Sequence, residues 1–440
     1  MHRATLKHLK QWKSEKKRKP LILKGARQVG KTFLGRKLGE TFEHYVEVNF
    51  ELLPKAMTIF ENDLLPDRIV RELSLFTGRK IIDGKTLLFL DEIQAAPKAI
   101  QALRYFYEMR PDLHVIAAGS LLDFELEKIG LPVGRVSFLY IYPMSFLEFL
   151  EARDETLLKE EIIAHHIHDK MGKAVHQKLL SMVGEYLAIG GMPEAVLHWI
   201  ENDDLEGCRK IHRTIIETYR QDFSKYATKY QTDYIDLIFN NIPRLLGRKF
   251  QYAHIPGDFR ARALKPALAL LLKAGVVHQV VHTKATGIPL AAEINPDKFK
   301  VIFLDIALAQ TLLGTETKSW ILEPNVQFNN KGSITEAFVG QELLSYGRND
   351  VEQRLFYWHR EARSSSAELD YVIQKKDQIV PIEVKSGAPG SLKSMRLFLD
   401  SHSNASCGIR FSSMNYEKTD DIYNYPLYAI GHLFQQEKIH

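Results

Sequence analysis

The sequence predicts an α/β protein with a parallel sheet near its N-terminus, a helical middle region and a second α/β unit near its C-terminus. Between residues 20 and 150, short apolar runs alternate with stretches of helical periodicity, which is typical of a parallel sheet covered on both faces. Between residues 151 and 230, apolar residues recur at intervals of three and four. Beyond residue 330, strand-like runs return.

Composition restricts the class of protein. Of the 440 residues, 45% are apolar and 26% are charged, as in ordinary soluble globular proteins. The net charge of +5 permits a polyanionic partner but does not argue for one. The two cysteines are far apart and lack a metal-type spacing, which argues against a disulfide scaffold or a zinc finger. No apolar run reaches the ~18 residues of a membrane span, and no secretory signal is evident, so we expect a cytoplasmic protein without membrane contact.

In the N-terminal region, apolar runs predict four strands separated by helices. We expect strands at Leu21–Leu23, Tyr45–Phe50, Thr86–Leu90 and Val115–Ala118, and a helix at Lys31–Thr41.

The rest of the chain divides by pattern. A helix at 264–273, followed by Gly275 and β-branched residues, predicts a winged-helix-like element in the helical middle. Further on we expect a strand at 301–304, a helix at 334–346, strands at 355–359, 369–373 and 379–384, and a helix at 392–399. The predicted domains are residues 1–155, 156–315 and 316–440.

A glycine-rich segment between the first strand and the first helix matches G-x-x-x-x-G-K-[ST] at every required position. Its glycines allow a tight turn in which successive amides point at one phosphate, and the following helix adds its dipole. The lysine then reaches the β- and γ-phosphates, and the threonine hydroxyl binds Mg²⁺. The predicted nucleotide-binding residues are Gly25, Ala26, Arg27, Gln28, Val29, Gly30, Lys31 and Thr32.

The predicted strand at 86–90 ends in two acids. Asp91 is suited to hold Mg²⁺ together with Thr32, and Glu92 is suited to polarise the attacking water. Lys31 and Glu92 are therefore the predicted catalytic pair of an ATP-hydrolysing P-loop NTPase.

Three further polar residues are candidates for the same site. Ser120 follows the strand at 115–118 and is predicted either to contact the γ-phosphate or merely to sit in a turn or helix cap. Arg135 is a candidate charge-stabilising arginine, acting in its own subunit or across a subunit interface. Arg27 is a weaker candidate for that role, and a surface arginine is the alternative for both.

These motifs, with segments further along the chain, resemble a large prokaryotic group of AAA-type ATPases in which a C-terminal region called DUF4143 follows the ATPase domain. The resemblance implies that the strand ending in Ser120 lies between the loop strand and the Asp91 strand. Ala26 replaces the usual proline, and Leu121 replaces the usual second serine after Ser120. The resembling segments are residues 23–32, 89–94, 134–135, 142–149, 190–194, 298–305 and 382–386.

Near the C-terminus, Asp370 and the triplet 383–385 have the order of a PD-(D/E)xK nuclease core. Strand alternation puts Glu383 and Lys385 on one face, where Asp370 and Glu383 would bind metal and Lys385 would orient water. Glu336 is a further candidate carboxylate. The pattern is short, and from these residues alone a surface strand with paired charges is the favoured interpretation. The resemblance, in contrast, implies a restriction-endonuclease-like fold. Leu369 replaces the usual proline.

The expected function is a Mg²⁺-dependent ATPase of AAA type coupled to a nuclease-fold domain that acts on DNA. The alternative is a nucleotide-dependent switch or scaffold whose C-terminal domain binds a partner or DNA without cutting. The expected cofactors are ATP and Mg²⁺, the expected partner is DNA, and the ring-forming habit of AAA-type relatives leaves a homo-oligomer open.

Overall fold

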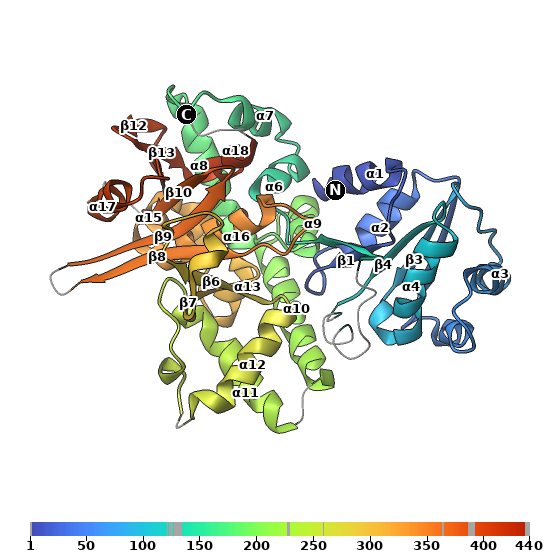
Figure 1. Cartoon of the computed structure of the whole chain (residues 1–440). Helices are drawn as coiled ribbons and strands as arrows, with labels where there is room; N and C mark the ends of the chain where they lie inside the picture. The colour runs from blue at the N-terminus through green and yellow to red at the C-terminus, as the bar shows by residue number, and fades with distance from the viewer. Residues whose placement is uncertain are drawn as a thin grey trace. The chain divides into compact units, whose positions relative to one another are not determined.

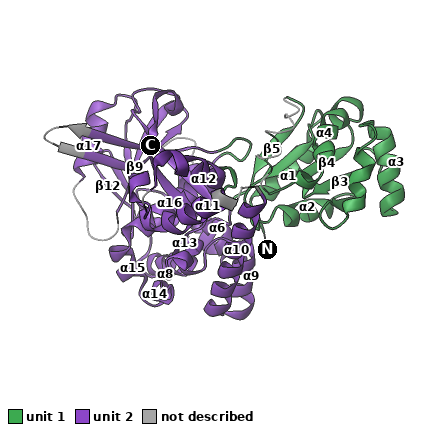
Figure 2. Ribbon diagram, turned by 90° about the horizontal axis from the view of Figure 1, so that it is seen from below, with its two compact units in different colours: residues 1–142, 273–275, 348–352 green, residues 143–272, 276–347, 353–440 purple. Residues whose placement is uncertain are grey.

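The computed structural model describes residues 2–120, 122, 126, 134–226, 229–257, 259–362, 365–385 and 392–435. The chain forms two compact units, each with its own core (Figure 1 and Figure 2). Unit 1 comprises residues 1–142, 273–275 and 348–352, and unit 2 comprises residues 143–272, 276–347 and 353–440.

Unit 1 is built on a five-stranded sheet of order β2-β3-β4-β1-β5, in which every neighbouring pair is parallel. The predicted parallel sheet is confirmed, and β4 lies between β1 and β3 as the family resemblance implies. The sequence pattern did not predict β5, the edge strand beside β1. The strands are β1 Leu21–Lys24, β2 His44–Asn49, β3 Thr86–Asp91, β4 His114–Ala118 and β5 Ser137–Tyr140.

Helices cover both faces of this sheet because its central strands are apolar on both sides. Leu88 and Leu90 of β3 pack in a core cluster with residues of α3 and α4. Phe89 points to the other face, where its ring packs so closely on α2 that a Cβ on Gly35 would lie 2.7 Å from it. The helices are α1 Thr5–Ser14, α2 Lys31–Gly39, α3 Pro66–Thr77 and α4 Pro97–Met109, with 3₁₀ turns η1 Pro54–Phe60 and η2 Ile93–Ala95.

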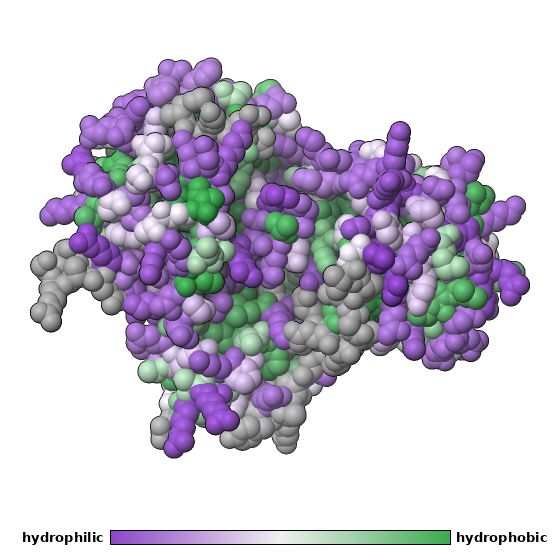
Figure 3. Space-filling view, in the orientation of Figure 1, coloured by the Kyte–Doolittle hydropathy of each residue, from purple (hydrophilic) through white to green (hydrophobic). Residues whose placement is uncertain are grey.

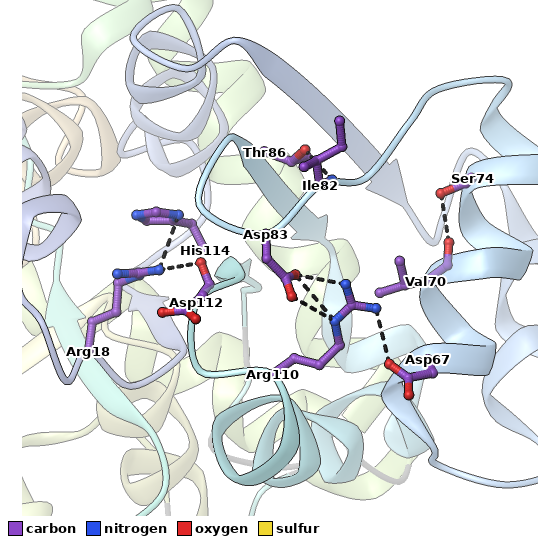
Figure 4. Close-up of polar contacts among 10 residues, drawn as sticks. All are labelled: Arg18, Asp67, Val70, Ser74, Ile82, Asp83, Thr86, Arg110, Asp112 and His114. Carbon is purple, nitrogen blue, oxygen red and sulfur yellow. Dashed lines mark hydrogen bonds and ion pairs between the residues drawn. The ribbon is translucent and has the colours of Figure 1, made fainter.

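Ion pairs and hydrogen bonds tie together the loops at the amino ends of these strands (Figure 4). Arg110, after α4, binds Asp83 at 2.9 Å and Asp67 at 3.2 Å. Arg18 donates to the carbonyl of Asp112 and lies 3.3 Å from Nδ1 of His114. Burial and then Arg18 lower the pKa of His114 to about 4, so this ring is neutral at pH 7. These contacts stabilise the end of the sheet at which the strands begin, which is opposite the end that carries the glycine-rich loop.

Unit 2 contains an eight-stranded mixed sheet of order β12-β13-β11-β10-β9-β8-β6-β7. The predicted helix-and-wing element is present as a helix followed by the antiparallel pair β6 and β7, but β6 also pairs with β8. The expected domain boundary at residue 315 thus falls between strands of one sheet. The strands are β6 Val277–Thr283, β7 Ile294–Phe303, β8 Leu355–Ala362, β9 Ser365–Lys375, β10 Gln378–Val384, β11 Gly408–Ser412, β12 Glu417–Thr419 and β13 Ile422–Pro426.

The remainder of unit 2 is helical, as predicted for residues 151–230, and α16 packs against β7, β8 and β10. Helices α8 and α9 are separated at the predicted break around Gly190. The helices are α6 Phe146–Ala152, α7 Thr156–Ala164, α8 Lys173–Ile189, α9 Pro193–Asn202, α10 Leu205–Tyr226, α11 Lys229–Asn241, α12 Ala261–Lys273, α13 Ile306–Leu312, α14 Lys318–Leu322, α15 Pro324–Asn330, α16 Gly332–Tyr346, α17 Lys393–Ser401 and α18 Ile430–Gln435.

One buried carboxylate joins two segments that the family resemblance singled out. Asp305 caps α13 by accepting hydrogen bonds from the backbone N–H groups of Ala307 and Leu308 at 2.9 and 3.1 Å. It also accepts from the N–H of Gly191 at 2.7 Å. A Cβ on Gly190 would lie 2.4 Å from Asp305 Oδ1, so a glycine is required there. Residues 190–194 and 298–305 are therefore structural partners within unit 2.

A second buried carboxylate makes the stability of unit 2 depend on pH. Glu342 of α16 accepts from the N–H of Phe146, the first residue of α6, at 3.0 and 3.1 Å, and burial raises its pKa to about 8. A raised pKa means that folding favours the protonated acid. This contribution is complete below the ordinary pKa of 4.5 and is lost as pH rises through about 8.

We therefore expect the free energy of unfolding of unit 2, measured with urea, to fall between pH 5 and 8, with a slope of at most about 1.4 kcal/mol per pH unit for one proton. Glu342→Gln keeps an acceptor oxygen without a charge, so its free energy of unfolding should vary less over this range. Burial also raises the pKa of Asp305 to about 6, so a smaller slope in the same direction should persist in the variant. Equal slopes in the two proteins would contradict the assignment.

The face of the molecule in Figure 3 is mainly hydrophilic, with several apolar patches. Leu52 and Leu75 of unit 1 and Leu157 and Leu322 of unit 2 are among the exposed large apolar side chains. Leu52 lines a pocket of unit 1 together with Leu53 and Phe76. Among the helices of the described residues, none combines the length and apolar character needed to span a membrane.

Candidate nucleotide site and C-terminal carboxylate centre

The glycine-rich loop lies where β1 ends and α2 begins, as predicted. Gly25 and Gly30 have φ of +150° and +99°, which L side chains rarely adopt. A Cβ on Gly25 would also lie 2.3 Å from the carbonyl oxygen of Ile141, so the chain has no room for a side chain there. The glycines therefore set the path of the loop around the amino end of α2.

The lysine of the loop is the first residue of α2 and is 8% exposed. Lys31 Nζ donates to the carbonyl oxygens of Gly25 and Ala26, both at 2.8 Å. Its ammonium is thus held at the loop, beside the amino end of α2, which favours negative charge.

Next to it, a hydroxyl and a carboxylate come together from different elements. Thr32 Oγ1 on α2 donates to Asp91 Oδ2 at the end of β3, at 2.9 Å. Asn49, opposite Asp91 in the pairing of β2 with β3, donates to the same oxygen at 3.1 Å. Burial, and then the charge of Glu92, raises the pKa of Asp91. Hard oxygen donors of this kind are the ligands that Mg²⁺ prefers, so the donor set fits that ion.

The second acid is held by a residue to which the sequence pattern assigned no role. Glu92 has φ of +49°, and its Oε2 accepts a hydrogen bond from Gln94 Nε2 at 2.6 Å. Gln94 in turn contacts the end of β4, where a Cβ on Gly119 would lie 2.3 Å from its Oε1. Gln94 therefore connects Glu92 to the segment that carries Ser120.

The remaining candidates for the nucleotide site are Ser120, Arg135 and Arg27. Ser120 is buried at the end of β4, between the loop strand and the Asp91 strand. Arg135 instead pairs with Glu108 on α4 at 2.8 Å, and Arg27 pairs with Glu51 at 3.5 Å. The sensor role of Ser120 and the charge-stabilising roles of the two arginines stay predictions.

Sequence reasoning missed Asn49 and Gln94. Both residues could have been found from the sequence: Asn49 is the polar last residue of an alternating strand, and Gln94 follows the paired acids by two positions.

We expect Gln94→Ala to lower the rate of ATP turnover by about 10- to 100-fold while leaving ADP affinity unchanged, because the side chain orients Glu92 rather than binding nucleotide. Gln11→Ala, on the exposed face of α1, is the matched control. A loss of ADP affinity in Gln94→Ala would contradict a role confined to Glu92.

In unit 2, antiparallel pairing of β9 with β10 brings the predicted C-terminal acids together. Asp370 Oδ2 accepts from the N–H of Val384 at 2.8 Å, and Glu383 Oε1 lies 2.8 Å from Lys385 Nζ. Ser386, the last residue of the resembling segment, lies outside the described residues. The metal-binding role of Asp370 and Glu383 and the catalytic role of Lys385 stay predictions.

A lysine from β7 lies among the carboxylates. Lys300 Nζ is 2.9 Å from Glu336 Oε1, 2.5 Å from Glu368 Oε1 and 3.5 Å from Asp370 Oδ1. Burial raises the pKa of Glu336 and of Asp370. Burial alone would lower the pKa of Lys300, but the three acids outweigh it and raise that pKa. Within the described ranges, no group of three or more His, Cys, Asp or Glu side chains is arranged to hold a metal ion.

The sheet order and the glycine-rich loop with its Lys31, Thr32 and Asp91 define unit 1 as a P-loop domain of the AAA type. Family models agree: residues 17–150 match an AAA domain, and residues 331–430 match the domain of unknown function DUF4143. The chain is thus an AAA protein with a C-terminal DUF4143 domain, which confirms the family that its motifs resemble. Residues 181–319 match a further domain of unknown function, DUF8612.

The solved structures that are similar to this chain share little sequence identity with it. The Walker-type ATPase PABY2304 of Pyrococcus abyssi is 14% identical with a TM-score of 0.44, and the match covers 70% of this chain and 94% of that one. The Orc1 protein of Aeropyrum pernix in complex with DNA is 16% identical with a TM-score of 0.27, covering 71% and 91%. AMPPCP-bound DnaA from Aquifex aeolicus is 13% identical with a TM-score of 0.27, covering 60% and 73%. No curated protein sequence matches this chain significantly.

Proposed function

We propose that unit 1 binds ATP with Mg²⁺ and hydrolyses it to ADP and phosphate. The observation that carries the proposal is the 2.9 Å hydrogen bond between Thr32 Oγ1 and Asp91 Oδ2, beside the Lys31 ammonium on the same loop. It joins the two halves of the sequence motif into one group of the right chemistry for a phosphate-bound cation.

Each residue has a distinct part in this proposal. The amides of residues 25–32 and the Lys31 ammonium bind the phosphates, and Thr32 and Asp91 supply oxygen ligands for Mg²⁺. The bound ion would neutralise charge on the phosphate oxygens. Glu92, oriented by Gln94, polarises the attacking water.

The proposal is tested by Lys31→Ala. Loss of the charged donor is expected to weaken ATP binding by about 10- to 100-fold, since hydrogen bonds to charged groups contribute about 1.5–3 kcal/mol. Isothermal calorimetry with ATP and Mg²⁺ gives the affinity. Lys37→Ala is the matched control, because Lys37 is a half-exposed residue of the same helix and pairs with Glu40. If wild-type protein, folded by circular dichroism, bound no adenine nucleotide, the proposal would be wrong.

For the C-terminal domain, we weigh two activities. In the first, Asp370, Glu383 and Lys385 cut DNA with a divalent metal ion, and ATP turnover gates the cutting. In the second, the protein is a nucleotide-dependent switch whose C-terminal domain binds a partner or DNA without cutting. The contact of Asp370 with the Lys300 ammonium favours the second, because this carboxylate already has a cationic partner.

One assay distinguishes DNA cutting from binding without cutting. Plasmid and branched DNA are incubated with the protein, ATP and Mg²⁺ or Mn²⁺, and Asp370→Ala and Lys31→Ala serve as controls. Cutting that disappears in Asp370→Ala would establish the first activity. Without cutting, DNA affinity that falls steeply as salt rises would support DNA binding, since phosphate contacts release counterions.

A further inference from the structure

The carboxylate centre of unit 2 is assembled around an ammonium group. Glu336 comes from α16, Glu368 and Asp370 come from one face of β9, and all three acids contact Lys300 Nζ at 2.5–3.5 Å. Lys300 extends from β7, with its ammonium 5.5 Å from the ring centre of Tyr357 on β8. Only 2% of Lys300 is exposed, so the charge is almost completely removed from water.

Neither the Lys300 ammonium nor the group of three carboxylates would be stable at this position without the other. A buried ammonium without a counter-charge is costly, and three partly buried carboxylates around one point repel one another. Burial and mutual repulsion raise the pKa of Glu336, and Lys300 opposes that rise. Some cation is therefore required at the point where the three acids converge.

A divalent metal ion and an ammonium compete for such a point. Mg²⁺ binds oxygen at about 2.0–2.1 Å and needs the carboxylates free. The observed separations are those of hydrogen bonds and ion pairs, and the ammonium occupies the converging point itself. On the adjacent strand β10, Glu383 is 4% exposed, and its Oε2 has no hydrogen-bond partner among the described residues.

We propose that Lys300 is the built-in cation of this centre, so that the domain binds no divalent metal ion at Asp370 while Lys300 is in place. Removing the ammonium turns Glu336, Glu368 and Asp370 into a divalent-cation site, with Glu383 as a further oxygen donor. This inference is independent of ATP hydrolysis at the glycine-rich loop, and it stands whatever Lys31→Ala does.

The test is Mn²⁺ binding to the full chain without nucleotide, followed by the electron paramagnetic resonance signal of free Mn²⁺. We compare wild type, Asp370→Asn, Lys300→Met, Lys300→Arg and the double variant Lys300→Met with Asp370→Asn. We expect one additional Mn²⁺ site in Lys300→Met only, because Lys300→Arg keeps the charge and the double variant loses a ligand. Binding near Thr32 and Asp91 is common to all five proteins and cancels in the comparison.

Two results would overturn the proposal. One is a Mn²⁺ site in wild type that disappears in Asp370→Asn, which would mean that metal coexists with Lys300. The other is a Lys300→Met protein with a wild-type circular dichroism spectrum and no additional site. If Lys300→Met does not fold, the wild-type and Asp370→Asn pair decides alone: equal Mn²⁺ binding by the two supports the proposal.

Discussion

Glu92→Gln is expected to abolish most ATP turnover while leaving ATP binding intact. Glutamine has the size of glutamate and can still accept a hydrogen bond from Gln94, which now holds Glu92 at 2.6 Å. It cannot polarise water as a base, and removing a positioned base lowers a rate by about 10²–10⁴-fold. Lys31, Thr32 and Asp91 are unchanged, so the affinity for ATP should be that of the wild type.

An assay of phosphate release measures the rate of ATP turnover, and calorimetry measures the affinity for ATP. Glu40→Gln, at the exposed end of α2, makes the same chemical change away from the site and should leave both quantities unchanged. A Glu92→Gln protein with wild-type turnover would remove Glu92 from the mechanism. A protein that loses ATP binding as well would place Glu92 among the residues that hold nucleotide or its metal ion.

Asp305→Ala is expected to cause the largest loss of stability in unit 2, about 3–5 kcal/mol. The fully buried carboxylate accepts three backbone N–H groups, those of Gly191, Ala307 and Leu308. Alanine would leave these donors without their acceptor in a region that water does not reach, at about 1–3 kcal/mol for each buried group. It would also remove the cap of α13.

Chemical denaturation gives the free energy of unfolding for this comparison. Asp400→Ala, at an exposed position of α17, is the matched control and should change stability by less than about 0.5 kcal/mol. Asp305→Asn should lie between the two, because one acceptor oxygen is kept. If Asp305→Ala were as stable as the control, the three hydrogen bonds would contribute nothing to the fold.

The parts of the nucleotide site that lie in short, contiguous motifs were predictable from the sequence. The loop at 25–32 and the acids at the end of β3 are recognisable because each chemical task needs certain residue types at a short, fixed spacing. Strand patterns also located β2, β3 and β4 to within one residue of their ends, since apolar runs of this length are characteristic of buried strands. The position of β4 between β1 and β3 came from the family resemblance and is confirmed.

Contacts between distant segments were not predictable in the same way. Asn49 meets Asp91 only because β2 pairs with β3 in a register that sets their last residues opposite each other. The edge strand β5 is a four-residue run that has no distinctive pattern. The wing strands β6 and β7 joined the C-terminal sheet because β6 pairs with β8 across more than 70 intervening residues.

Sequence by itself thus determined the family, the phosphate loop and the identities of the catalytic candidates in unit 1, because those depend on short-range spacing and on side-chain chemistry. Tertiary structure alone decided what surrounds the C-terminal acids. Asp370 and Glu383 read as a metal-binding pair on adjacent strands, but packing brings the Lys300 ammonium from β7 to Glu336, Glu368 and Asp370. The charge that a buried carboxylate faces depends on which distant side chain folds against it, and no spacing rule contains that information.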